Sequence, residues 1–220
     1  MITDIIRKLA SNLSREEQSE LEIWARETEE LNAWVKGIQS PNRKVLTQAV
    51  DFQFVMLYNK VLESNIASIT INLPSTYRNV VIMGSGSITS ANGGNVWAQF
   101  NSDTGNNYTW QFIKGDNTTI SGGQDTSDPY VALGVFGTTG AGAGVNGSFR
   151  AEIIHCQGAW KKNVLSHCYT AEFNDLYLLG STWQNTAPIR TIEIFGTDNT
   201  LAKGTTNIAS GSLFTVYGML

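Results

Sequence analysis

In the first 64 residues, apolar side chains recur at every third or fourth position, which is the period of an amphipathic helix. A capping box of Ser14 and Glu17 precedes one such run, and Ser40-Pro41 begins another with an N-cap residue followed by proline. The second helix, predicted at about 42–63, carries two adjacent apolar stripes, too wide for a single neighbour to cover. We therefore expect a small helical domain that forms a bundle or serves in anchoring and oligomerisation. The residues expected to do this are Leu21, Trp24, Leu31, Val35, Phe52, Met56 and Leu57.

From residue 65 onward, apolar and polar residues alternate, as in Ile69, Ile71 and Leu73. Segments rich in Gly, Asn, Ser and Thr separate the apolar runs and are typical of turns. This succession of short strands predicts a jelly-roll β-sandwich at 65–220, so that the protein is mainly β with a helical domain at 1–64. The expected strands cover residues 66–73, 78–84, 95–101, 107–114, 130–136, 148–157, 164–173, 176–180, 189–196 and 212–218.

Composition changes at the same boundary. Residues 1–64 hold 18 of the 34 charged residues and a single glycine, whereas residues 65–220 hold the other 20 glycines. Only 15% of the chain is charged, which is typical of an all-β protein with many turns, or of an extracellular or virion surface, rather than of a metabolic enzyme. The net charge of −4 argues against nucleic-acid binding. The sequence shows neither a signal peptide nor a membrane span, so we expect synthesis in a cytoplasm, with reduced cysteines and no membrane insertion.

Five phrases in the second part resemble, in this order, a β-domain found in many virion proteins of tailed phages and prophages. They are LPSTYRNVVIMGSG (73–86), FNSDTGNNYTWQF (100–112), IIHCQGAWKKNVLSHCY (153–169), TAPIRTIEIF (186–195) after Trp183, and SGSLFTVYGML (210–220). The chain departs from the usual pattern at Val80 and Val216, where leucine is commoner. Both exchanges remain apolar.

The resemblance implies a component of the virion surface that is usually homotrimeric, has no enzymatic activity and needs no cofactor. Its implied partners are further copies of itself and either the major capsid protein or a tail or adaptor protein. The resemblance leaves open whether the protein is a capsid decoration or head fibre, or a tail fibre used in host attachment. Because the chain has no long repetitive shaft, a position on the capsid is slightly favoured.

The two His-Cys pairs, His155-Cys156 and His167-Cys168, raise the possibility of a zinc site. Adjacent residues of a strand point to opposite faces, so at most one member of each pair could meet on one side. We therefore expect two buried thiols in the core, with a metal site or a disulfide as less favoured alternatives. Lys161-Lys162, between these pairs, is expected to form a solvated hairpin tip.

The polar segments contain few further candidates for a metal, phosphate or catalytic site. Residues 114–129 are expected to form a loop whose aspartates, Asp116, Asp125 and Asp128, could hold calcium but match no EF-hand spacing. The glycine-rich segment 137–147 lacks the ending of a phosphate loop. The strand carboxylates stand alone in the sequence, which favours a non-enzymatic protein, although a glycosidase pair among them stays open. These are Glu152, Glu172 and Glu193.

Aromatic residues are more numerous than a core of this size needs, and several lie beside Asn- and Gly-rich loops. Rings flanked by such loops can hold sugars, so Trp97, Tyr108, Trp110 and Trp160 are candidate contacts for a host surface glycan. This would make the chain a receptor-binding protein, the alternative to a purely structural role. The alternative interpretation is that most of these rings pack in the core or in a subunit interface.

The last predicted strand is apolar on both of its faces. Leu213 and Tyr217 should point one way, and Phe214 and Val216 the other. One face would then be covered by the second sheet and the other by a neighbouring subunit of the trimer.

Overall fold

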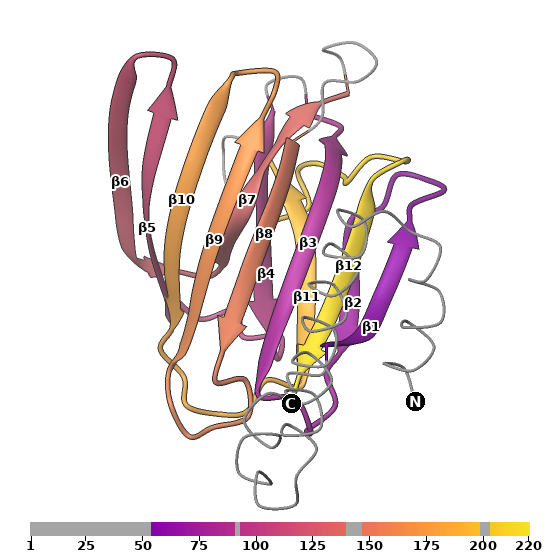
Figure 1. Cartoon of the computed structure of the whole chain (residues 1–220), viewed down its shortest axis with the longest axis vertical. Helices are drawn as coiled ribbons and strands as arrows, with labels where there is room; N and C mark the ends of the chain where they lie inside the picture. The colour runs from indigo at the N-terminus through magenta and orange to yellow at the C-terminus, as the bar shows by residue number, and fades with distance from the viewer. Residues whose placement is uncertain (1–53, 91–92, 140–146, 199–202) are drawn as a thin grey trace, which may run out of the picture. The chain divides into compact units, whose positions relative to one another are not determined.

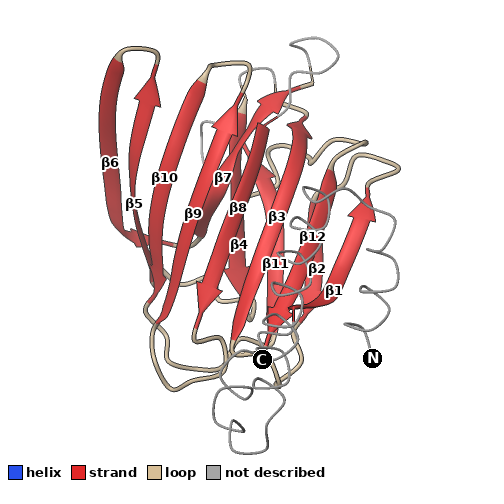
Figure 2. Cartoon of the chain, viewed as in Figure 1, coloured by secondary structure: helices blue, strands red, loops and turns tan. Residues whose placement is uncertain are grey.

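The computed structural model describes residues 54–90, 93–139, 147–198 and 203–220, and every regular element in these ranges is a β-strand (Figures 1 and 2). The chain divides into a unit of Met1–Phe52 and a unit of Gln53–Leu220, and the described residues all belong to the second. Its strands are β1 (Phe54–Val61), β2 (Ser68–Asn72), β3 (Asn79–Ile88), β4 (Gly94–Phe100), β5 (Tyr108–Asp116), β6 (Thr119–Asp128), β7 (Val131–Thr138), β8 (Gly147–Ile154), β9 (Lys162–Thr170), β10 (Asp175–Trp183), β11 (Thr191–Thr197) and β12 (Leu213–Met219). The expectation of a mainly β protein is confirmed.

The strands form two antiparallel layers. The larger sheet has the order β1-β12-β3-β8-β9-β10-β5-β6, and the smaller sheet has the order β2-β11-β4-β7. A short parallel pairing of Ser87 and Ile88 in β3 with Gly137 and Thr138 in β7 links them. In Figure 1 the larger sheet spreads across the view, with β4, β7 and β11 of the smaller sheet behind it. The arrangement is that of a β-sandwich.

The alternation of side chains places the core between these layers. In β9, buried and exposed positions alternate without a break, so Val164 and Cys168 point inward while Leu165 and His167 point outward. Three phenylalanines then join the sheets. Phe136 of the smaller sheet lies 5.7 Å from Phe149 and 5.9 Å from Phe214 of the larger one, measured between ring centroids, and all three rings are buried.

The phrase FNSDTGNNY folds into a compact connection between β4 and β5. The carboxylate of Asp103 accepts a hydrogen bond from the indole N–H of Trp183 at 2.8 Å and another from the backbone N–H of Gly105 at 3.0 Å. The hydroxyl of Tyr108 accepts a hydrogen bond from the backbone N–H of Phe100. The rings of Trp183 and Tyr108 stack in the core. The hydrogen bonds of Asp103 and Tyr108 therefore hold the turn between β4 and β5 in place.

Asn101 ties the same connection to the phrase TAPIRTIEIF. Its backbone is left-handed (φ 52°), a conformation that asparagine tolerates better than most residues. Its side-chain oxygen accepts hydrogen bonds from the backbone N–H groups of Arg190 and Thr191, and its amide donates to the carbonyl of Pro188. Two phrases far apart in the sequence thus form one structural unit at the end of the sandwich.

The strand β12 lies between β1 and β3 and is an inner strand of the larger sheet. The side chains of Phe214 and Val216 are fully buried, whereas Leu213 is 39% exposed on the other face. Gly218 is required by packing, because a Cβ atom there would lie 2.5 Å from the ring of Tyr77. The expected division of β12 between an inner and an outer face is confirmed.

Two expectations for the elements are wrong. Residues 54–61 form strand β1, paired with β12, instead of the end of a helix at 42–63, so Met56 and Leu57 lie on a strand. The β unit accordingly begins at residue 53 rather than 65. Pairing with β12 outweighs a local apolar pattern that fits either period. Leu21, Trp24, Leu31, Val35 and Phe52, and with them the predicted helical domain, lie outside the described residues.

The segment 114–129 is also not a loop. It forms the end of β5, a turn at Asn117 with a left-handed φ of 49°, and the strand β6. All residues of β6 but Asp128 are exposed, and β6 pairs with β5 alone. An edge strand of this kind needs no apolar face, so alternation could not reveal it.

Candidate interaction surfaces

The outer face of the larger sheet carries exposed apolar side chains. On β5, β9 and β10 they form what we call the first apolar patch, whose members each expose between 44% and 59% of their surface. Register makes them neighbours, because Leu178 lies opposite Ile113 on β5 and Leu176 lies opposite Tyr169 on β9. The patch consists of Ile113, Leu165, Tyr169, Leu176 and Leu178.

A second apolar patch lies on β1, β3 and β12 of the same face. Leu213 lies opposite Val61, and Tyr217 lies opposite Met56. The ring of Phe54 packs edge-on against Tyr217 at 6.2 Å. The patch consists of Phe54, Met56, Val61, Met83, Leu213 and Tyr217. This is the outward face of β12 that the sequence assigned to a neighbouring subunit.

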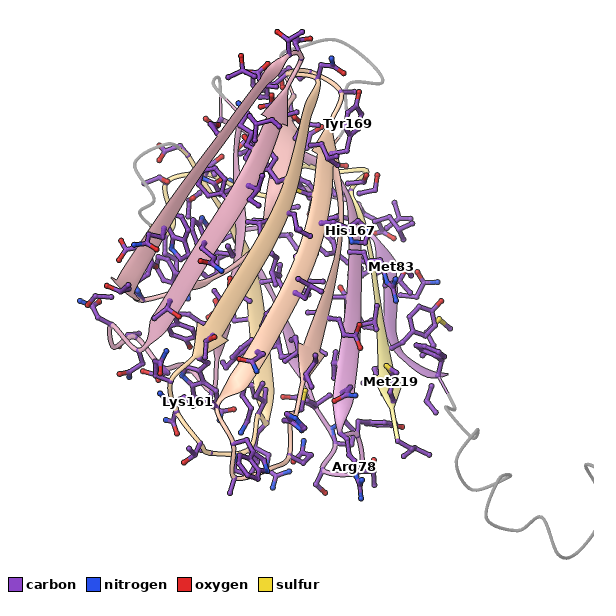
Figure 3. The ribbon with its side chains drawn as sticks, turned by 60° about the vertical axis from the view of Figure 1, so that its left-hand side comes forward. Arg78, Met83, Lys161, His167, Tyr169 and Met219 are labelled. Carbon is purple, nitrogen blue, oxygen red and sulfur yellow. The ribbon has the colours of Figure 1, made fainter. Side chains whose placement is uncertain are left out.

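A polar strip separates the two patches. It consists of Ser148, Arg150 and Glu152 on β8 and His167 on β9, and Arg150 lies opposite both His167 and Met83. Figure 3 shows Met83, His167 and Tyr169 together on this side of the molecule. A shallow hollow of about 410 Å³ runs along the strip, between Tyr169 and Leu213. Groups of exposed apolar side chains bordered by polar residues are typical of an interaction surface.

The four aromatic residues proposed as glycan contacts do not share one surface. Trp97 is only 3% exposed, and Tyr108 is fully buried at the start of β5, so neither offers an open ring face. Trp160 is 69% exposed in the connection between β8 and β9. Trp110 is half-buried on the inward side of β5, where its ring meets Trp97 edge-on at a centroid distance of 5.9 Å.

The contact between Trp97 and Trp110 forms one end of a pocket of about 190 Å³, which we call the aromatic pocket. Phe112, two residues along β5, stacks on Trp110 at 6.0 Å, and Tyr177 of β10 lies 5.8 Å from Phe112. The rings of Trp110, Phe112 and Tyr177 are half-buried. Sequence reasoning missed Phe112 and Tyr177, because each reads as an ordinary residue of a strand.

The polar atoms of these rings are held by carboxylates. The indole N–H of Trp110 donates to Asp128 at 3.0 Å, and the hydroxyl of Tyr177 donates to Asp175 at 3.2 Å. Lys114 forms a 2.8 Å ion pair with Asp175, and the hydrogen bond to Asp175 raises the pKa of Lys114. Burial and the adjacent Asp175 raise the pKa of Tyr177 to about 12, so its hydroxyl stays protonated.

The cysteines and the second lysine of the hairpin are buried. Cys156 and Cys168 are buried free thiols, and burial raises the pKa of each to about 12. The expected solvated tip at Lys161-Lys162 is wrong for Lys162, which is fully buried. Its ammonium group donates to the carbonyls of Gly158, Trp160 and Thr186, and these bonds compensate its removal from water.

The acidic residues considered for chemistry have separate contacts. Glu172 accepts hydrogen bonds from the backbone and hydroxyl of Thr138, and Glu193 pairs with Lys203 at 2.6 Å. Within the described residues, no three His, Cys, Asp or Glu side chains come together as metal ligands. No helix in the same ranges is long and apolar enough to cross a membrane.

No family model matches the chain, and no curated protein has a detectably similar sequence.

Proposed function

We propose that this chain is a non-enzymatic surface protein of a bacteriophage virion, assembled as a homotrimer through the outer face of its larger sheet. The observation that carries the proposal is the pair of apolar patches, which a soluble monomer would leave in water. The N-terminal region would attach the trimer to the major capsid protein, as a decoration or head fibre, or to a tail or adaptor protein. The resemblance of the phrases supports a place on the virion surface.

The strand order supports a jelly roll as the body of this protein. Without the hairpins β5–β6 and β9–β10, eight strands remain: β1, β2, β3, β4, β7, β8, β11 and β12. Counted along the chain, they pair as 1-8-3-6 in one sheet and 2-7-4-5 in the other, an order that two nested Greek keys produce. The two hairpins then appear as insertions that widen one sheet.

The layout of the outer face favours a ring. Two different patches lie on either side of a polar strip, so the first patch of one copy can pack on the second patch of the next copy. Such head-to-tail contacts close into a ring when the rotation between copies allows it. In the strip, Arg150 and Glu152 point outward on β8 and form no ion pair within the described residues, so both are available to a neighbouring copy.

Charge substitutions in each patch test the proposal. Leu178→Glu alters the first patch and Leu213→Glu the second, and Asn72→Glu on the exposed face of the smaller sheet is the control. Light scattering should find both patch variants dissociated and the control intact. Because each patch variant keeps one good patch, their mixture should form a two-chain complex. Patch variants that assemble like the control would contradict the proposal.

A second candidate function is host attachment through a surface glycan, as in a tail fibre or receptor-binding protein. The observation that favours it is the aromatic pocket, where Trp97 and Trp110 meet. Purified protein should then compete with phage for adsorption to host cells. Unchanged adsorption in the presence of excess protein would contradict this role.

A further inference from the structure

The aromatic pocket lies where the larger sheet continues past the smaller one. Its walls come from β4 and β7 of the smaller sheet and from β5 and β10 of the larger sheet. Ala132 and Gly134 of β7 also line it, and neither carries a bulky side chain. Figure 1 shows β10, β5 and β6 at the end of the larger sheet that is farthest from β1.

The size of the pocket limits its ligand. A volume of about 190 Å³ corresponds to roughly six water molecules at about 30 Å³ each. This accommodates one six-membered ring but not a long acyl chain or a folded peptide segment. The pocket is also more enclosed than the hollows on the outer face of the larger sheet.

Three half-buried rings in a row favour a ligand with an apolar face. Trp110 and Phe112 stack with an interplanar angle of 22°, and Tyr177 continues the row beyond Phe112. Their polar atoms are already bonded to Asp128 and Asp175, so the rings are held in place before a ligand arrives. A preorganised aromatic lining of this kind suits the apolar C–H groups of a sugar ring.

The remaining groups of the pocket are neutral. The Asn95 amide lines it and forms no hydrogen bond within the described residues, so it can bind a hydroxyl group. The nearby charges are already compensated: Asp128 accepts two N–H groups, and Lys114 is paired with Asp175. Among the described residues, a phosphate or carboxylate ligand would find no free cation beside the pocket.

We propose that the aromatic pocket binds a single neutral pyranose ring, packed against the aromatic lining that includes Trp110 and hydrogen-bonded to Asn95. This deepens the second candidate function and rests on it, because the sugar would be one unit of the host glycan. It requires no particular oligomeric state, since every wall of the pocket comes from one chain.

Saturation-transfer NMR on the full chain tests the proposal. The probes are methyl β-D-glucopyranoside, methyl β-D-galactopyranoside, methyl α-D-mannopyranoside and N-acetylglucosamine at millimolar concentration, with irradiation of the protein's aromatic protons. At least one probe should receive saturation on its ring C–H protons. Absence of transfer to all four, or tighter binding of glucuronate than of the glucoside, would overturn the proposal.

Matched variants locate the binding. Trp110→Ala should weaken the affinity for the responding probe about tenfold by removing a stacking surface. Asn95→Ala should weaken it about fivefold, with little effect on the fold, by removing one hydrogen bond. Trp160→Ala removes an exposed ring outside the pocket and should leave the affinity unchanged. If Trp110→Ala and Asn95→Ala bound the probe as tightly as the wild type does, the assignment would be overturned. A loss of affinity in Trp160→Ala alone would overturn it as well.

The host-cell adsorption experiment distinguishes sugar binding by the pocket from a role of the pocket in host attachment. Glycoside binding that depends on Trp110 and Asn95, together with unchanged phage adsorption, would establish the pocket and contradict host attachment. Competition in adsorption that survives the Trp110→Ala substitution would place host attachment elsewhere and overturn the pocket as the receptor site.

Discussion

Two neighbouring residues of β12 allow folding and assembly to be perturbed separately. Phe214 points inward, is fully buried, and lies 5.9 Å from Phe136 and 6.3 Å from Phe149 between ring centroids. Leu213 points outward and is 39% exposed in the second apolar patch. The variants Phe214→Ala and Leu213→Ala therefore shorten adjacent side chains of one strand on opposite faces of one sheet.

The expected magnitudes differ clearly. Removing a buried phenylalanine ring costs about 3–5 kcal/mol through lost burial and the cavity that remains. A small domain has a total stability of about 5–15 kcal/mol, so Phe214→Ala should lose a large part of the free energy of unfolding. Leu213→Ala leaves the core intact and should change the intrinsic stability of one chain by less than about 1 kcal/mol. Its effect should appear in the association of chains instead.

Urea unfolding at two protein concentrations distinguishes these effects. A trimer that unfolds to monomers becomes more stable as concentration rises. Phe214→Ala should lower the unfolding midpoint at both concentrations, whereas Leu213→Ala should lower it mainly where the wild type is assembled. A loss of less than about 1 kcal/mol for Phe214→Ala would refute the assigned core. Equal, concentration-independent losses for both variants would refute the assignment of the outer face to assembly.

Three further predictions concern packing, pH and reactivity. Gly218→Ala should lower the thermal midpoint, because its Cβ atom would clash with the Tyr77 ring. Gly115→Ala is the control, because the space around Gly115 is open. A smaller fall of the midpoint in Gly218→Ala than in the control would contradict the prediction. Burial raises the pKa of Asp103, but hydrogen bonds led by the Trp183 N–H outweigh this and hold the pKa below its usual value. The contribution of this carboxylate is therefore present above about pH 4 and is lost as pH falls further, so stability curves of Asp103→Asn should be flatter in acid than those of the wild type. The buried thiols of Cys156 and Cys168, with pKa values of about 12, should react with a thiol reagent only after unfolding. Fast modification of the native protein would contradict their burial.

The parts of the fold that could be predicted from sequence are those where alternation meets burial. In β9 the inward Val164 and Cys168 alternate with outward residues. In β12 the alternation of positions alone distinguishes the inward Phe214 from the outward Leu213. The phrases around Asn101 were visible as motifs. Their meaning, a hydrogen-bonded tie between distant segments, needs coordinates because sequence spacing carries no contact information.

The errors have physical causes. The run before Val61 fits both a helix and a strand, and only its partner β12 decides between them. The strand β6 has no apolar face, since it lies at an edge, and it therefore resembles a loop. The buried Lys162 and the pocket-lining Phe112 and Tyr177 become distinctive only when carbonyls and rings from several strands surround them.

The mass of the purified 220-residue chain in solution shows whether it forms the proposed trimer. A homotrimer whose outer faces cover one another should give three times the chain mass of 24.0 kDa, about 72 kDa, in multi-angle light scattering. The Leu178→Glu variant should fall to a lower mass under the same conditions. A wild type that remains at 24.0 kDa at every accessible concentration would contradict the account, because both apolar patches would then stay exposed to water.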